Sequence, residues 1–136
     1  FLDSNVLFSA IYNNKNCTYP SIIVDLSKRK VFNLFISTLV KLEVRHNILK
    51  KIPKKIWLFK EIVKETKIVQ DVEFTINPII SLPRNDRIIL GTAIYYNMDC
   101  FITGNTKDFS EFIGKKICNT IILKPKDFFT NFHPGD

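Results

Sequence analysis

Residues 31–36 read Val-Phe-Asn-Leu-Phe-Ile, with apolar side chains at both odd and even positions. Because successive side chains of a strand point to opposite faces of a sheet, this run indicates a strand that is buried on both faces. Similar short apolar segments precede Asp3 and recur at residues 67–72, 100–103 and 119–123. We therefore expect about five strands, with residues 31–36 in the centre of their sheet.

Segments with helical periodicity separate these strands. The predicted helices cover residues 6–11, 20–27, 38–51, 54–65, 86–96 and 125–132. The inward faces of two of them are predicted to carry Val40, Val44 and Ile48, and Ile56, Phe59 and Val63. Strands that alternate with helices form parallel sheets between helical layers. The expected fold class is therefore α/β, a three-layer α/β/α arrangement around a central, mostly parallel sheet.

Polar side chains mark where several of the predicted helices begin. Asp3 precedes the first helix, Ser37 or Thr38 begins another, and Asp86 begins the fifth. A side-chain oxygen at such a position accepts hydrogen bonds from the free backbone amides of the first turn. These side chains, or their neighbours, are therefore expected at helix N-termini.

The length and composition describe one globular domain. The chain has 136 residues, 46% of them hydrophobic and 24% charged. One core spanning residues 1–136 is expected, because two ordinary domains need a longer chain. No apolar run approaches the roughly 20 residues that cross a bilayer, and no signal-peptide pattern is visible. Because the sequence begins with Phe1 rather than Met, we expect its natural start to be missing.

The cysteines indicate the compartment. Cys17, Cys100 and Cys118 are odd in number and far apart in the sequence. This usage favours reduced thiols in an intracellular protein and argues against a zinc site. We therefore expect a cytoplasmic protein without membrane attachment, and self-association into a homo-oligomer stays open.

Basic residues are concentrated in one part of the chain. The net charge is +7, and residues 41–67 alone carry nine Lys or Arg and three Glu. Such a segment supplies salt-sensitive affinity for phosphate backbones. The alternative is an ordinary solvated surface, and the sequence does not decide between the two.

Oxygen-bearing side chains fall near the ends of the predicted strands. Asp3 follows the first strand, Glu43 lies in the helix after the second, and Asp86 begins a later helix. Asn105 and Asp108 follow the strand after that helix. In open parallel sheets, functional groups gather at the carboxyl ends of the strands. We expect these side chains to form one site.

The types of these residues indicate the chemistry. No serine lies in a nucleophile elbow, the four glycines form no phosphate-binding loop, and of the two histidines we interpret His46 as a polar residue at a helix edge and His133 as terminal. Clustered carboxylates repel one another unless a cation lies between them. Mg²⁺ or Mn²⁺ accepts oxygen ligands and activates water for attack on a phosphodiester. The residues therefore predict metal-dependent phosphodiester hydrolysis.

Three segments resemble motifs of the PIN-domain ribonucleases. They are residues 1–10 (FLDSNVLFSA), 86–93 (DRIILGTA) and 101–109 (FITGNTKDF). The last resembles the Thr-Gly-Asn-Thr version of a branch assigned to toxins of toxin–antitoxin pairs. Glu43 falls where the family has its second acid, which is its least specific motif. The resemblance covers nearly the whole chain.

The resemblance implies a PIN-like fold and a Mg²⁺- or Mn²⁺-dependent endoribonuclease that cleaves RNA with a metal-activated water. It implies a catalytic, metal-binding site of Asp3, Glu43, Asp86 and a fourth group, either Asn105 or Asp108. Many family members have Asp where this chain has Asn105, so a charge is lost there that Asp108 can replace. RNA is the implied substrate, and an antitoxin protein is the implied partner if the chain is a toxin.

Further residues are expected to act around this centre. Asn5 is expected to steady Asp3, and Ser4 or Thr103 to contact a ligand water. Basic residues near the acids, or in the basic segment, are expected to bind RNA phosphates. They are Arg84, Arg87, Lys107, Lys41 and Arg45.

Two other functions stay open. The start of the chain loosely resembles haloacid-dehalogenase-like phosphatases, with Asp3 as nucleophile, although Asn5 stands where that chemistry needs an acid. A PIN-like domain with weak or no activity would instead be an RNA-binding or protein-interaction module, which the neutral Asn105 favours. The simplest structural explanations are that Asp3 and Asp86 cap helices and that Asp108 is a turn residue.

Overall fold

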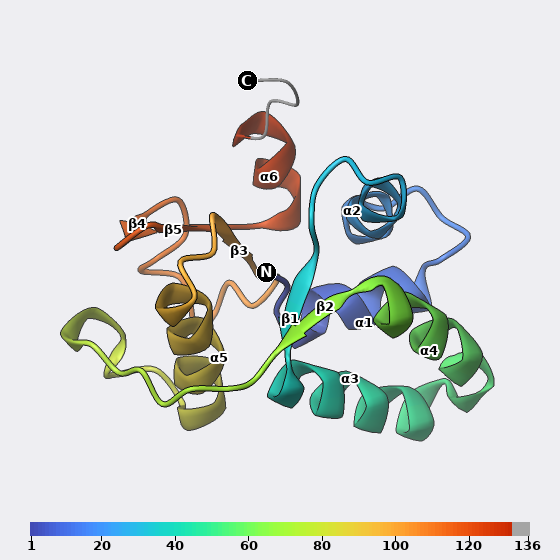
Figure 1. The fold of residues 1–136 in the computed structure, drawn as a ribbon, viewed down its shortest axis with the longest axis horizontal. Helices are drawn as coiled ribbons and strands as arrows, with labels where there is room; N and C mark the ends of the chain where they lie inside the picture. The colour runs from blue at the N-terminus through green and yellow to red at the C-terminus, as the bar shows by residue number, and fades with distance from the viewer. Residues whose placement is uncertain (132–136) are drawn as a thin grey trace.

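Helices and strands are interspersed along the chain. The computed structural model, which describes residues 1–131, has the mixed α/β architecture that the sequence predicts (Figure 1). The helices are α1 (Ser4–Tyr12), α2 (Tyr19–Lys28), α3 (Thr38–Lys51), α4 (Ile56–Glu65), α5 (Arg84–Tyr95) and α6 (Pro125–Asn131). The strands are β1 (Phe35–Ser37), β2 (Lys67–Val69), β3 (Cys100–Ile102), β4 (Lys116–Ile117) and β5 (Thr120–Leu123). Short 3₁₀ helices are η1 (Pro53–Lys55) and η2 (Asn77–Ile79).

The strands form two small sheets. In one, β1 pairs with β2 in parallel. In the other, β5 lies between β3 and β4, parallel to β3 and antiparallel to β4. The sequence analysis did not predict β4, which is a two-residue edge strand.

Residues 1–3 lie between the two sheets and are hydrogen-bonded to both. The Leu2 amide donates to the Phe35 carbonyl of β1 (3.0 Å). On the other side, the Asp3 amide donates to the Ile102 carbonyl of β3 (2.9 Å), and the Ile102 amide donates to the Phe1 carbonyl (2.9 Å). Leu2 and Ile102 form a parallel bridge. The end of this segment therefore places Asp3 beside the carboxyl ends of β1 and β3.

The helices pack around these strands and against one another. α1 packs on α2 and α3, α3 packs on α4, and α6 packs on α2 and β5 (Figure 1). Among residues 1–131, no helix is both long and apolar enough to cross a membrane. Phe132, expected at the end of the last helix, and His133 lie outside the described residues.

The apolar run at residues 31–36 was predicted to be a strand over its whole length, which is wrong for its first part. Strand pairing begins only at Phe35, and Val31 is 39% exposed. Lys30 has a positive φ of 64°, and the Val31 amide donates back to the Leu26 carbonyl (3.1 Å). Residues 29–34 are therefore needed to turn the chain from α2 into β1.

The buried faces of the predicted helices are mostly confirmed. Val40, Val44 and Ile48 are fully buried on α3, as expected. On α4 the buried residues are Leu58, Phe59 and Ile62, whereas Ile56 and Val63 lie at the edge of the core. The expected start of this helix at Lys54 belongs instead to η1, so α4 begins two residues later, at Ile56.

The prediction that Asp86 caps its helix is also wrong. Pro83 occupies the N-cap position of α5, and Asp86 is the third residue of the first turn. Pro83 has a ψ of 149°, which is the non-helical backbone usual for an N-cap, and it offers no side-chain hydrogen bond to the first turn. The Asp86 carboxylate is therefore not used for capping, although it still lies close to the positive end of the helix dipole.

Candidate functional site

Asp3 is the most buried acid of the predicted site, at 3% exposure. It forms the N-cap of α1, and its Oδ1 accepts a hydrogen bond from the Ser4 amide (2.8 Å). Its Oδ2 accepts from Thr103 Oγ1 (2.8 Å) and from Asn5 Nδ2 (3.1 Å). Burial raises the pKa of Asp3 and the charge of Glu43 adds to this, whereas the three hydrogen bonds act in the opposite direction. The carboxyl group is thus held in one orientation by three donors.

Glu43 approaches Asp3 from the first turns of α3. Its Oε1 accepts a hydrogen bond from Ser4 Oγ (2.5 Å), and its Oε2 accepts one from Asn85 Nδ2 (3.2 Å). Ser37 caps this helix by accepting from the Val40 amide (3.3 Å), so the helix that carries Glu43 begins at the end of β1. Ser4 therefore connects the two acids, since its amide binds Asp3 and its hydroxyl binds Glu43.

Asp86 and Asp108 form an interacting pair at the other side of the site. The pKa of Asp86 is raised to about 6, first by burial, then by the charges of Asp3 and Asp108, by a hydrogen bond with the Asp108 side chain, and by Glu43. Neighbouring carboxylates disfavour the ionised form of a carboxyl group, which is the direction of the shift at Asp86. Asp86 therefore interacts electrostatically with each of the other three acids.

The loop after β3 joins these groups. The Gly104 amide donates to Asn5 Oδ1 (2.7 Å), and the Asn105 amide donates to Thr103 Oγ1 (3.0 Å). Asn105 Nδ2 donates to Asp108 Oδ2 (2.9 Å), and the Asp108 amide donates to Asn105 Oδ1 (3.2 Å). In this arrangement Asn105 positions Asp108, and Asp108 is the one that contacts Asp86.

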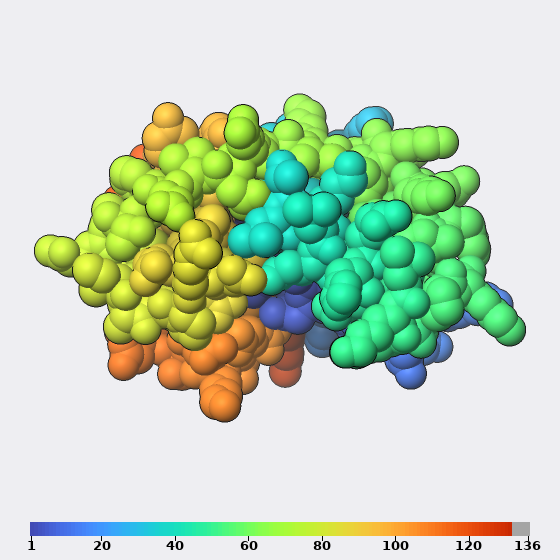
Figure 2. Space-filling view, turned by 90° about the horizontal axis from the view of Figure 1, so that it is seen from below, coloured from blue at the N-terminus to red at the C-terminus, as the bar shows by residue number. Residues whose placement is uncertain are grey.

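A pocket of about 430 Å³ opens between these elements. Its lining residues are Asp3, Ser4, Asn5, Phe8, Glu43, His46, Asn47, Lys51 and Asp86. In the space-filling view, dark-blue atoms of the first residues lie in a hollow between the teal atoms of α3 and the yellow and orange atoms of α5 and the segment after β3 (Figure 2). Three of the four predicted acids thus face one hollow of the surface.

A larger cavity, of about 510 Å³, lies elsewhere and is mainly apolar. Its lining includes Phe1, Leu34, Met98 and Cys100, and none of the four predicted acids. Size alone therefore does not identify the site. We consider the smaller pocket the candidate because it gathers the side chains that carry charge.

The acids fit a hard divalent cation in the type and number of their oxygen atoms. A carboxylate offers about four lone-pair positions. The hydrogen bonds described above use three of them on Asp3 and two on Glu43, so each keeps at least one. Within residues 1–131, no group of three or more His, Cys, Asp or Glu side chains is arranged closely enough to hold a metal ion as it stands. The carboxyl groups would have to move closer together to bind one ion.

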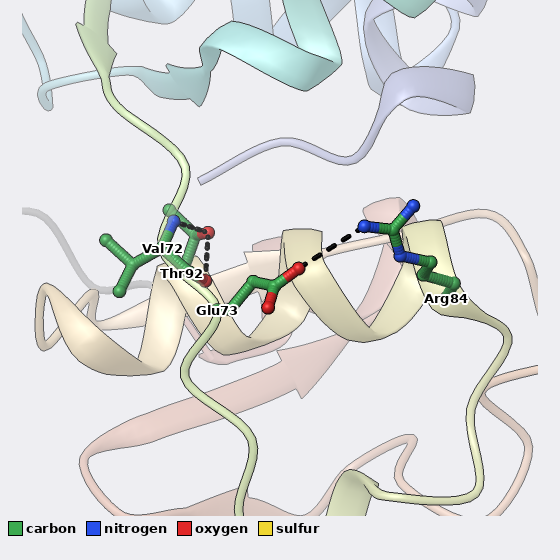
Figure 3. A network of polar contacts seen from close by, with 4 residues as sticks. All are labelled: Val72, Glu73, Arg84 and Thr92. Carbon is green, nitrogen blue, oxygen red and sulfur yellow. Dashed lines mark hydrogen bonds and ion pairs between the residues drawn. The ribbon is translucent and has the colours of Figure 1, made fainter.

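The basic residues predicted to bind RNA do not line the pocket. Arg84 forms an ion pair with Glu73 (3.4 Å), and both side chains are largely exposed (Figure 3). Arg87 Nη1 donates to the Ile80 carbonyl (3.5 Å). Lys107 and Arg45 are exposed and Lys41 is half-buried, and none of the five lines the pocket.

Sequence reasoning missed several residues that line or support the pocket. Lys51 and Asn47 lie on the same face of α3 as Glu43, at distances of eight and four residues, which is helical spacing. His46, interpreted as a polar edge residue, is exposed but also lines the pocket. Asn85 immediately precedes Asp86 and binds Glu43. Helical spacing from Glu43 is the signal that identifies the α3 residues.

The segment between β2 and η2 fixes α5, and thereby Asp86, in place. The Val72 amide donates to the fully buried Thr92 Oγ1 (3.0 Å), as Figure 3 shows. Beside it, a Cβ atom on Gly91 would lie 2.4 Å from the Phe74 carbonyl oxygen. Only glycine allows the segment to approach the helix this closely. The Gly91-Thr92 pair is therefore explained by packing.

Comparison of the chain with protein-family models and with curated proteins finds no match.

Proposed function

We propose that the chain is a divalent-metal-dependent endoribonuclease of the PIN type. The observation that carries the proposal is that Asp3, Glu43 and Asp86, which come from three separate elements, line one pocket, with Asp108 in contact with Asp86. Four acids that interact electrostatically in a half-buried hollow are costly without a cation. The raised pKa values of Asp3 and Asp86 are the expected sign of such a site in the absence of a cation.

The proposal includes the finer architecture of the fold. We propose that the two sheets and residues 1–3 form one mostly parallel sheet, in the order β2, β1, residues 1–3, β3, β5, β4, covered by helices on both faces. The hydrogen bonds of Leu2 to β1 and of Asp3 to β3 support this arrangement. Ligands of such sheets bind at the carboxyl ends of the strands, where Asp3 lies.

The residues of the pocket have distinct roles in this proposal. Asp3, fixed by Ser4, Asn5 and Thr103, and Glu43, fixed by Ser4 and Asn85, would bind the ion together with Asp86. When bound, the ion supplies an activated water and neutralises charge on the phosphodiester. Asp108 would act on this set of ligands through its contact with Asp86.

Incubation with a mixture of RNAs tests the proposal. The unchanged chain is expected to cleave RNA with Mn²⁺ and not with EDTA. Asp86→Asn is expected to lower the rate at least a hundredfold, as loss of a group acting in the transition state does, while its circular dichroism spectrum stays the same. Lys60→Gln, a substitution on the exposed side of α4, is the matched control and is expected to retain the activity. Full activity of the Asp86 variant would refute the proposal.

A second candidate is an RNA-binding or protein-interaction module without activity. Two observations favour it: the neutral Asn105 donates to Asp108 rather than supplying a charge, and the described residues contain no ready-made metal cluster. This candidate predicts RNA binding in EDTA and no products with Mn²⁺. The same incubation therefore distinguishes the two functions.

The phosphatase alternative is weakened by the geometry around Asp3. A nucleophilic carboxylate needs an accessible oxygen, whereas Asp3 is 3% exposed and its Oδ2 accepts two hydrogen bonds. Asn5, which stands where an acid would be needed, donates to Asp3 and accepts from Gly104. We therefore do not extend the proposal to aspartyl-phosphate chemistry.

A further inference from the structure

Two aromatic side chains lie one helical turn apart on α1, beside the pocket. Phe8 lines the pocket, and Tyr12 lies one helical turn farther from Asp3. Their rings stack with centroids 6.1 Å apart and an interplanar angle of 27°. Tyr12 is 55% exposed, although a large aromatic ring is usually placed where it excludes water. We call Phe8 and Tyr12 the aromatic ridge.

Two lysines lie over the aromatic ridge, and they differ in what else they bind. Lys55 Nζ, 5.8 Å from the centre of the Tyr12 ring, also donates to the Ile11 and Tyr12 carbonyls and to Asn14 Oδ1 (3.3, 2.7 and 2.9 Å), so it holds the end of α1. Lys51 Nζ lies 5.5 Å from the centre of the Phe8 ring and lines the pocket. Among the described residues, Lys51 forms no ion pair. It is the cation of the pocket wall that is available to a bound anion.

The charge of the pocket wall changes sign along α3. Glu43, His46, Asn47 and Lys51 all line the pocket from this helix. At a rise of 1.5 Å per residue, Lys51 lies about 12 Å along the helix from Glu43. If one phosphate of a polyanion lay near the acids, the next part of the polyanion would lie beside His46 and Asn47. The part after that would lie beside Lys51. This order suits a chain of successive phosphates.

We propose that the aromatic ridge and Lys51 bind single-stranded RNA next to the phosphodiester that is cleaved, with Tyr12 stacking on a base and Lys51 pairing with a phosphate. The inference rests on the proposed function, because it takes the acids as the place of cleavage. Single strands can stack their bases on exposed aromatic rings, whereas the bases of a duplex are already stacked on one another. The ridge therefore selects unpaired RNA.

Binding measured without cleavage tests the inference. A fluorescein-labelled single-stranded RNA is titrated in EDTA against Tyr12→Ala and Lys51→Gln, with Trp57→Ala and Lys60→Gln as matched controls. Trp57 is equally exposed, at 56%, and both control residues lie on α4. Tyr12→Ala is expected to weaken binding about tenfold, as loss of one base–aromatic stack does. Lys51→Gln is expected to reduce the slope of log K against log salt by about 0.7, the value for one phosphate of a single strand.

The controls are expected to bind like the unchanged chain, and a duplex of the same sequence is expected to be insensitive to Tyr12→Ala. Equal affinities and equal salt slopes for all four variants would overturn the inference, and would favour a protein as the occupant of the aromatic ridge. The proposed function is tested separately by cleavage with Mn²⁺. If RNA is cleaved but Tyr12 and Lys51 prove irrelevant to binding, only the inference fails.

Discussion

Single residues determine the electrostatics of the pocket, and Asp86 is the clearest example. Its pKa of about 6 arises from burial and from three other acids, none of which lies nearby in the sequence. The sequence therefore predicted the identity of this acid but not its protonation. A carboxyl group with a raised pKa binds its proton more tightly in the folded chain than in the unfolded one.

This difference sets the direction of the pH dependence without metal. The free energy of unfolding is expected to decrease as the pH rises from 3.8, the ordinary value, through about 6, because the folded chain loses a proton that it holds more tightly. Asp86→Asn removes the charge and is expected to be more stable than the unchanged chain at neutral pH, by about 1 kcal/mol after allowance for solvent screening. Urea unfolding in EDTA at several pH values measures both effects. Identical pH profiles for the two proteins would contradict the raised pKa of Asp86.

Thr103 is a second such residue, and its hydrogen bonds can be tested separately from the packing of its side chain. Its buried hydroxyl donates to Asp3 Oδ2 and accepts from the Asn105 amide. Thr103→Val keeps the shape but leaves both partners without this hydrogen bond, so it is expected to destabilise the fold by about 1–3 kcal/mol. Thr103→Ser, which keeps the hydroxyl, is expected to retain most of the stability. Chemical unfolding of the pair measures the difference, and equal losses would mean that packing matters more than the hydrogen bonds.

At the scale of elements, α5 depends on the segment of residues 70–76 that lies against it. Gly91→Ala is expected to destabilise the chain, because the new Cβ would meet the Phe74 carbonyl at 2.4 Å. An ordinary helical glycine gives the opposite sign, since alanine is favoured there by about 1 kcal/mol. The midpoint of urea unfolding shows whether the substitution stabilises or destabilises the chain. A midpoint that rises would show that the segment does not press on the helix.

The elements also show how far the sequence could predict the fold. Val40, Val44 and Ile48 were identified correctly because branched apolar residues recur there at intervals of four, which is helical spacing. Residues 31–34 were misjudged because an apolar run does not distinguish a strand from a packed turn, and the left-handed Lys30 leaves no apolar signal. Lys51 was missed as a pocket residue because its position depends on how α3 is rotated about its axis relative to α1. Tertiary packing determines that rotation, and the sequence pattern does not.

At the scale of the whole molecule, a bound cation is expected to act as a structural connection between separate elements. Because ligands that bind only the folded state stabilise it, a concentration of Mn²⁺ one hundred times its dissociation constant is expected to add about 2.7 kcal/mol. The melting temperature of the unchanged chain is therefore expected to rise on addition of Mn²⁺. Asp86→Asn is expected to respond much less, and Lys60→Gln normally. A rise of the same size in all three proteins would show that the ion binds elsewhere.

The position of residues 1–3 determines when the pocket can exist. These residues are hydrogen-bonded to β1 and β3, and Asp3 accepts a hydrogen bond from Thr103, one hundred positions later. A growing polypeptide on the ribosome therefore carries Asp3 and Glu43 long before it carries β3 and Thr103, which complete the hydrogen bonds that hold Asp3 in place. Nascent chains that stop before β3 contain Asp3, Glu43 and Asp86 but lack Thr103 and Asp108. Any activity that needs all of these groups therefore begins only after β3 and the loop that follows it have been synthesised.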